Sequence, residues 1–246
     1  MPNDVATAQP LSRQEILDRH ARGNPVLEAI AGRTSVRAFL PTPIPRETVE
    51  RILAVASRAA SGSNTQPWKV YVVSGAARDR LTADVLHAHD HDEASHVREY
   101  EYYMVNWRDP YLTRRRKVGW GLYGILGIGR QDKEEMHRQR GRNYLFFDAP
   151  VGLILTIERD LEQGSWIDLG IFLGNVMTAA RGLGLETCAQ AAFANFHKIL
   201  RRHLPIPDQE IVVCGMALGH ADPDAVVNRL ETEREPVAAF ARFFDR

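Results

Sequence analysis

Two short segments in the first third of the chain carry the residues best suited to chemistry. Residues 33–37, Arg-Thr-Ser-Val-Arg, place two guanidiniums and two hydroxyls close together. Residues 61–68, Ser-Gly-Ser-Asn-Thr-Gln-Pro-Trp, form a turn of small residues with two amide side chains. Guanidiniums bind phosphate through charge-assisted, often bidentate hydrogen bonds, and amides adapt to the edge of a flat heterocycle. Together the segments favour a phosphorylated cofactor with a planar ring.

The order and spacing of these segments resemble the opening of the nitroreductase family. The matching motifs stand at residues 33–39, 43–45, 61–68, 182–188, 214–219 and 234–236. The resemblance therefore covers about residues 25–246, and its joint pattern is specific although each piece alone is weak. The family consists of homodimeric, FMN-dependent oxidoreductases. A nitroreductase-like fold follows as the expectation, with flavin at the dimer interface and NADH or NADPH as electron donor.

The resemblance implies which residues hold the phosphate end of FMN. Arg33, Ser35 and Arg37 match the family residues that bind the phosphate and the ribityl chain. Arg234 stands just before a proline, as does the family arginine that closes on the phosphate. Whether Arg229 also touches the phosphate stays open.

The resemblance also implies which residues lie near the flavin ring. Asn64 and Gln66 would hydrogen-bond near the ring of the partner subunit, and the segment after Cys188 would present a backbone N–H beneath it. Gln190 and Ala191 stand where the family often has an acidic residue or a glycine, which leaves the side-chain contacts there in doubt. The expected cofactor-binding set is Arg33, Thr34, Ser35, Arg37, Ser61, Gly62, Ser63, Asn64, Gln66, Ala189, Gln190, Ala191, Gly219 and Arg234.

The reaction implied is transfer of electrons from NAD(P)H to an electrophilic acceptor such as a nitroaromatic, in a ping-pong sequence. No side chain need act as acid, base or nucleophile, because the flavin carries the chemistry. Residues 110–128 resemble the nitrobenzoate-reductase-like subgroup. Alternatives on the same fold are dehalogenation, enone reduction or flavin breakdown. A flavin-binding protein without turnover is the alternative outside enzymes.

Composition narrows the class of protein. The 246 residues are 44% hydrophobic and 25% charged, as in an ordinary globular protein. Lys and Arg together number 31, as do Asp and Glu, so net charge gives no argument for nucleic acid or an anionic membrane. Two cysteines are too few for a disulfide framework, and we expect both as buried thiols. With no apolar membrane segment or signal peptide evident, we expect a cytoplasmic protein. The family resemblance implies a homodimer that acts on a small molecule.

Three further motifs offer other chemistry. Residues 119–124 spell a dinucleotide fingerprint, but a basic run at 114–117 precedes it instead of a strand, so we reject it. The basic run suits a solvated face or the recruitment of an acidic substrate or nicotinamide phosphates. Histidines at 87, 89, 91 and 96 are interpreted as a solvated loop, and we expect no metal.

The elements expected around these motifs alternate along the chain. Helices are predicted at 12–21, 45–60, 76–86, 166–181 and 195–204, and strands at 69–74, 151–157 and 211–216. We expect one α+β domain over 1–246, with a central mixed sheet flanked by helices on both faces. Residues 1–10 are expected to be flexible and 87–143 to form a helical insertion over the cofactor site. The helix at 166–181 is apolar on more than one face, which favours a dimer.

Overall fold

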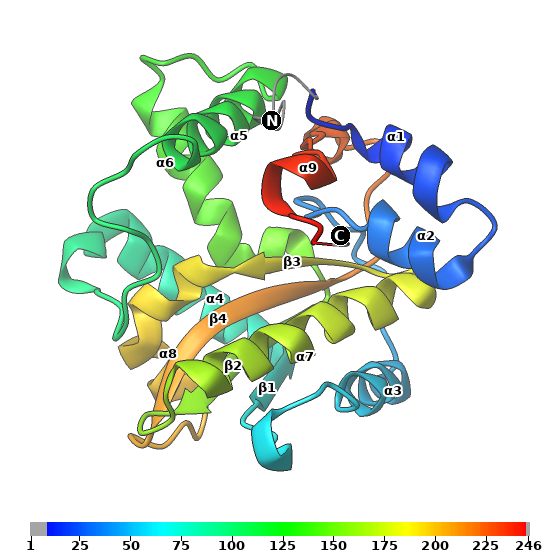
Figure 1. Ribbon diagram of the computed structural model, residues 1–246. Coiled ribbons are helices and arrows are strands. Elements are labelled where there is room, and N and C mark those ends of the chain that lie inside the picture. The colour runs from blue at the N-terminus through cyan, green and yellow to red at the C-terminus, as the bar shows by residue number, and fades with distance from the viewer. Residues whose placement is uncertain (1–8, 245–246) are drawn as a thin grey trace.

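A four-stranded sheet lies between two layers of helices in the computed structural model, which describes residues 9–244 (Figure 1). The strands β1 (Lys69–Ser74), β2 (Val151–Glu158), β3 (Glu186–Gln190) and β4 (Glu210–Gly219) stand in the order β1-β2-β4-β3. All three neighbouring pairs are antiparallel. The expected mixed sheet is therefore antiparallel across its four strands. The parallel pairing found within residues 9–244 is an isolated bridge between Ser35, which lies outside the four strands, and Thr187 of β3.

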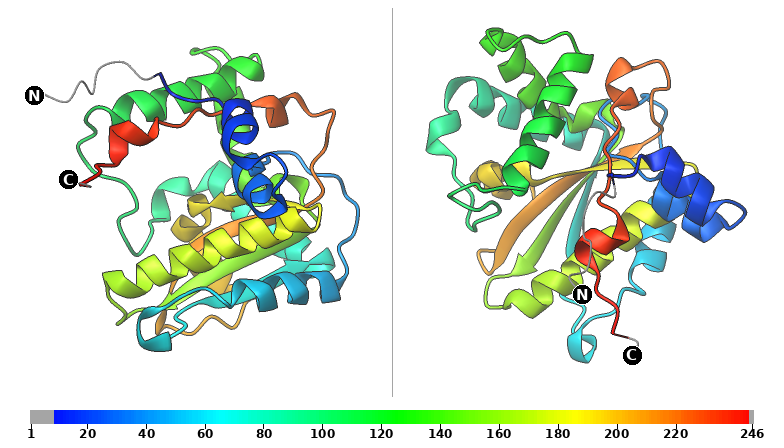
Figure 2. Two further views of the ribbon diagram at one scale, coloured as in Figure 1. Left: turned by 45° about the vertical axis from the view of Figure 1, so that its right-hand side comes forward. Right: turned by 45° about the horizontal axis from the view of Figure 1, so that its top comes forward.

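Different helices cover the two faces of the sheet (Figures 1 and 2). On one face, α7 (Gln163–Gly182) and α3 (Arg46–Ala56) bury the apolar residues of a core shared with β2 and β4. On the other, α4 (Gly75–His91) and α8 (His197–His203) enclose a second core that includes a run of phenylalanines. Trp68 stacks on Phe172 of α7 with ring centroids 4.9 Å apart, so it packs against this core. The expected α+β architecture with helices on both faces is confirmed.

Two glycines let aromatic rings lie flat on the second face. A Cβ atom added at Gly152 of β2 would stand 2.4 Å from the ring of Phe146, and one at Gly215 of β4 would stand 2.4 Å from Phe193. The two rings stack on each other with centroids 4.5 Å apart. Any side chain at either glycine would displace this stack, since interiors are packed at crystal-like density.

The amino-terminal helices follow local capping signals. The Ser12 hydroxyl and the Glu15 carboxylate form a capping box for α1 (Arg13–Ile16), which runs on into a π-helical turn at Leu17–Ala21. Asn24 caps α2 (Pro25–Gly32) by accepting from the N–H groups of Val26 and Leu27. The flexible end expected for 1–10 lies mostly outside the described residues. Leu11 is held by paired backbone hydrogen bonds with Arg234.

The insertion begins later than expected, because α4 continues to His91 where the sequence predicted its end near residue 86. After a short turn at Glu93–Ser95 and an irregular stretch, it forms α5 (Tyr111–Ile125) and α6 (Lys133–Gly141). Residues 119–124 lie inside α5 and not between a strand and a helix, so they form no dinucleotide turn. A short α9 (Val237–Phe240) ends the described chain. No helix within residues 9–244 has both the length and the apolarity to cross a membrane.

Candidate cofactor site

The segment 33–37 lies along the free edge of β3. Ser35 bridges Thr187 in parallel, and the Val36 N–H donates to the Thr187 carbonyl at 3.2 Å. This extended conformation sends alternate side chains to the same side. Arg33 and Arg37 accordingly both act on the buried thiol of Cys188: burial raises its pKa, and the two guanidiniums oppose that shift.

An asparagine far along the chain fixes the backbone of this segment. The Asn228 side-chain oxygen accepts from the Arg37 N–H at 2.8 Å, and its amide nitrogen donates to the carbonyls of Ala38 and Asp222 at 2.8 and 2.9 Å. Sequence analysis missed Asn228, because no local pattern marks it. The neighbouring Arg229 is exposed and lines neither of the cavities described below, so the structure gives it no place at the site.

Arg234 reaches the same region through its pairing with the amino terminus. Its N–H and carbonyl exchange hydrogen bonds with Leu11 at 2.8 and 2.7 Å. Burial lowers the pKa of Arg33, and the nearby positive charge of Arg234 lowers it further. Two like charges held this close destabilise each other unless an anion lies between them.

The charges at this site are unevenly compensated. Within residues 9–244, none of Arg33, Arg37 and Arg234 forms an ion pair with a carboxylate. The cations around them do form such pairs: Arg13 with Glu231, Arg114 with Glu235, and Lys117 with Glu233. The three guanidiniums therefore carry positive charge that no neighbouring carboxylate within residues 9–244 pairs with. This makes the site suited to an anion with more than one negative charge.

Two cavities share this arginine cluster. The larger, of about 600 Å³, is lined by Ser35, Arg37 and one face of α5, and the smaller, of about 250 Å³, by Arg33 and Thr34. Glu231, Thr232 and Arg234 line both. The larger cavity therefore runs from the arginines to residues of α5, among them Arg114 and Lys117.

A larger cavity lies elsewhere, with about 740 Å³ between the start of α4 and the proline-rich loop at 41–45. Its charged side chains are already paired, Arg78 with Asp79 and Arg142 with Asp148. The arginine cluster is therefore the better candidate for a cofactor site, although its cavities are smaller.

The turn 61–66 lies on another part of the surface, beyond α7 and away from α2 and the arginine segment (Figures 1 and 2). One chain does not bring the two predicted halves of the site together. Ser63, Asn64 and Gln66 have positive φ angles of 50°, 59° and 50°, and their side chains are exposed. Each such residue costs about 1–3 kcal/mol and persists only when its surroundings hold it.

Two hydrogen bonds hold this turn in place. The Asp168 carboxylate of α7 accepts from the Gly62 N–H at 3.0 Å, and the Ser61 hydroxyl accepts from the Gln66 N–H at 3.1 Å. Sequence analysis missed Asp168. Its one signal was an acidic residue in the first half of a largely apolar helix.

Of the residues expected under the flavin ring, Ala189 and Gln190 end β3, and Ala191 begins the 3-10 turn Ala191–Phe196. Ala189 is exposed and Ala191 half-buried, but the Gln190 side chain turns into the core and donates to the Asn143 carbonyl at 2.5 Å. Its amide therefore faces away from solvent, so only the backbone there can serve a ligand. Gly219 is buried, and a Cβ atom there would stand 2.8 Å from Pro150, so packing alone accounts for this glycine.

Comparison with known proteins places the chain in a family. The sequence profile of the nitroreductase family matches residues 30–220. The chain belongs to the nitroreductase family. It is 41% identical to a 4-nitrobenzoate reductase of Pseudomonas putida, over 88% of this chain and 95% of the relative. It is 40% identical to a nitrobenzene nitroreductase of Ectopseudomonas oleovorans over the same shares of the two chains.

Solved structures with the same fold belong to this family too. The FMN and NADPH-dependent nitroreductase NfnB from Sphigopyxis sp. strain HMH superposes with a TM-score of 0.86 at 36% identity, covering 90% of this chain and 99% of its own. The FMN-dependent nitroreductase NfnB from Mycobacterium smegmatis, in complex with NADPH, gives a TM-score of 0.85 at 32% identity, covering 89% and 98%. The nitroreductase-like fold predicted from the sequence motifs is thereby confirmed.

Proposed function

We propose that this protein is an FMN-dependent oxidoreductase that passes electrons from NADH or NADPH to a nitroaromatic acceptor of the nitrobenzoate type. The observation that carries the proposal is the arginine cluster. Three guanidiniums without carboxylate partners converge from two parts of the chain, and a phosphate monoester carries up to two negative charges to match them.

The residues of the cluster fit the phosphate end of FMN in both charge and geometry. Arg33, Arg37 and Arg234 would hold the phosphate, with Ser35 at the wall of the larger cavity beside it. Asn228 keeps the segment extended so that both of its arginines face the ligand. When bound, FMN would supply the hydride chemistry that no side chain of the chain provides.

The acceptor class rests on the relatives and on the insertion. Relatives about 40% identical are named 4-nitrobenzoate reductase and nitrobenzene nitroreductase. In the insertion, the Arg115 guanidinium lies 4.4 Å over the Trp107 ring and 5.8 Å from the Tyr103 ring, with no ion pair in residues 9–244. An aromatic surface carrying a free cation suits a flat acceptor with a carboxylate.

Donor and acceptor would use one flavin face in turn, which predicts ping-pong kinetics. Initial rates at several fixed acceptor concentrations should then give parallel double-reciprocal lines. Intersecting lines would indicate a ternary complex and a roomier site.

The deciding experiment identifies the cofactor and follows its redox state. Heat should release FMN, recognised by mass, and anaerobic NADH or NADPH should bleach the yellow protein. Addition of 4-nitrobenzoate should restore the colour. Recovery of FAD, or of no flavin after reconstitution, would remove the cofactor assignment. A flavin that stays oxidised with both nicotinamides would favour the alternative of a flavin-binding protein without turnover.

A further inference from the structure

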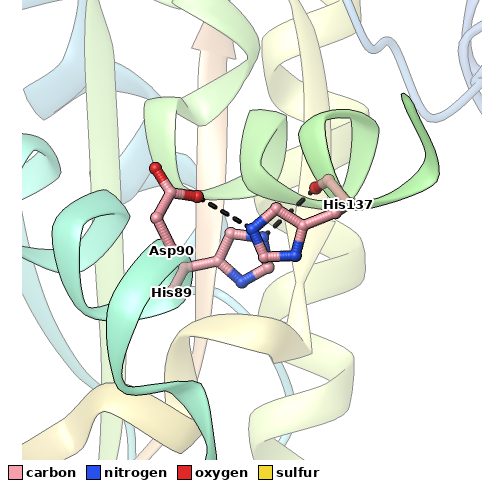
Figure 3. A group of neighbouring side chains, drawn as sticks. All are labelled: His89, Asp90 and His137. Carbon is pink, nitrogen blue, oxygen red and sulfur yellow. Dashed lines mark hydrogen bonds and ion pairs between the residues drawn. The ribbon is translucent and has the colours of Figure 1, made fainter. Parts of the chain in front are cut away.

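The helices α4 and α6 meet at a cluster of three potential metal ligands, His89, Asp90 and His137 (Figure 3). The two imidazole rings stack with centroids 4.1 Å apart and planes 7° apart. The Asp90 carboxylate points to the Nε2 atom of His137 at 2.9 Å. The solvated loop predicted for these histidines is wrong, because α4 continues through His91 and buries His89.

The hydrogen bonds around His89 leave one of its nitrogens without a partner. Its Nε2 lies 3.2 Å from the backbone carbonyl of His137, so Nε2 carries the proton of the neutral ring. Nδ1 then has only a lone pair, and it is buried with no hydrogen-bond donor. A carboxylate oxygen of the exposed Glu93 lies 3.4 Å from Nδ1, and it is also an acceptor. A buried acceptor that faces another acceptor is costly unless a proton comes between them.

We propose that α4 and α6 form a binding site for a divalent transition-metal ion of the zinc class. The ligands are Nε2 of His89, a carboxylate oxygen of Asp90 and Nε2 of His137, and suitable atoms of the three residues lie within 4.8 Å of one another. Metal bonds to imidazole and carboxylate are about 2.0–2.2 Å long. The two rings must therefore rotate out of their stack, and Nε2 of His89 must leave the His137 carbonyl, for the three ligands to close on one ion. Two imidazoles and one carboxylate match the ligand preference of Zn²⁺, with water completing the shell.

Metal binding resolves the unpartnered nitrogen. An ion on Nε2 of His89 requires the ring proton on Nδ1, which then donates to Glu93. A carboxylate that holds a ligating histidine in this way is a common companion of metal sites. His137 and Asp90 are partly exposed, so the ion can enter from solvent. The bound ion would tie the insertion to α4, and the site shares no residue with the arginine cluster.

The test uses the flavin-loaded protein with a second pair of histidines removed. His87 and His91 lie one turn apart on α4 with ring centroids 4.5 Å apart, and they could bind metal themselves. The reference is therefore His87→Gln with His91→Gln, stripped with EDTA and titrated with zinc chloride by calorimetry. We expect one Zn²⁺ per chain and a zinc-dependent rise in Tm. His137→Gln in this background should lose both, and Glu93→Gln should weaken binding about 10–100-fold.

Two outcomes would overturn the proposal: no saturable zinc binding by the reference, or the same binding after His137→Gln. Comparing the Tm of the His137→Gln variant with the Tm of the reference, both measured in EDTA, shows whether the variant folds normally without metal. Should it not fold, Asp90→Asn, at an exposed position, gives the same test.

Discussion

At the scale of single residues, the arginine cluster predicts how FMN affinity changes when one guanidinium is removed. A charge-assisted hydrogen bond contributes about 1.5–3 kcal/mol, or about tenfold to a hundredfold in affinity. Arg37→Ala and Arg33→Ala should each weaken FMN binding by that factor, measured by fluorescence titration of the apoprotein. Arg229→Ala removes an equal charge from a nearby exposed position outside both cavities, and should bind FMN as the native protein does. Unchanged affinity in both site variants would show that the phosphate lies elsewhere.

Single residues of the candidate site differ in how far the sequence alone can reveal them. The arginine motif is local, so its residue types and spacing are sufficient to mark it as a candidate phosphate site. Asn228 and Asp168 act across 191 and 106 positions of the chain, on Arg37 and Gly62 respectively. Neither contact leaves a mark in the residues around it, because tertiary packing alone brings the partners together.

At the scale of elements, the turn 61–66 depends on one carboxylate of α7. Asp168→Ala would leave the Gly62 N–H without its acceptor and let the strained turn relax. Because misplacing a positioning group by about 1 Å can cost a hundredfold in rate, we expect kcat/KM to fall about tenfold to a hundredfold, with little change in the Tm of the fold. Asp168→Asn keeps an acceptor and should retain most activity. Equal activity in both variants would show that the turn has no part in the site.

The start of the insertion predicts a pH dependence. Burial alone would raise the pKa of Glu99, but the hydrogen bond from Arg159 and the charges of His197, Arg159 and Arg201 outweigh it and lower the pKa. A Glu carboxyl group whose pKa is lower in the folded state than the unfolded value of 4.5 stabilises the folded state at pH values above 4.5. This contribution is lost as the pH falls through the lower pKa of the folded state. Urea midpoints of Glu99→Gln should lie below those of the native protein at pH 7 and converge with them in acid. The exposed Glu101→Gln is the control. A gap that stays constant with pH would contradict this account.

Elements were predictable where a local signal was strong. The strand at 69–74 matches β1, because its β-branched run ends at a glycine. The helix after Pro45 ends at Ala56 and not near residue 60, since no residue there marks the end clearly.

β3 was missed, because Glu186–Gln190 is a short, largely polar strand whose place depends on pairing with β4. α2 was missed despite its Asn24 cap and first-turn proline, which are the expected start signals of a helix.

At the scale of the whole molecule, large apolar side chains are exposed on α7 and near the carboxyl end. Ile167 and Ile171 of α7 are 67% and 41% exposed, close to Asp168 and the turn it holds. Phe240, Phe243 and Phe244 near the carboxyl end are 71–94% exposed. Phe243 and Phe244 follow α9 outside any helix or strand, and exposed apolar side chains gathered in this way are typical of a binding face. We propose that a second copy of the chain covers them, as the family resemblance implies.

A shared site can be tested by complementation between two inactive chains. If the turn 61–66 of one subunit completes the arginine cluster of its partner, Arg33→Ala and Asn64→Ala damage different halves of each site. A heterodimer of the two variants would then have one doubly damaged site and one intact site. Joint unfolding and refolding of the mixture should restore FMN binding and turnover, whereas each variant refolded alone should stay impaired. Sedimentation at low concentration should show a dimer, because obligate interfaces commonly bury more than about 2,000 Å² and leave no stable monomer. A fully active monomer would contradict the shared site, and so would a mixture no more active than its components. Either result would mean that one chain supplies both halves of the site, although residues 33–37 and 61–66 lie apart on its surface.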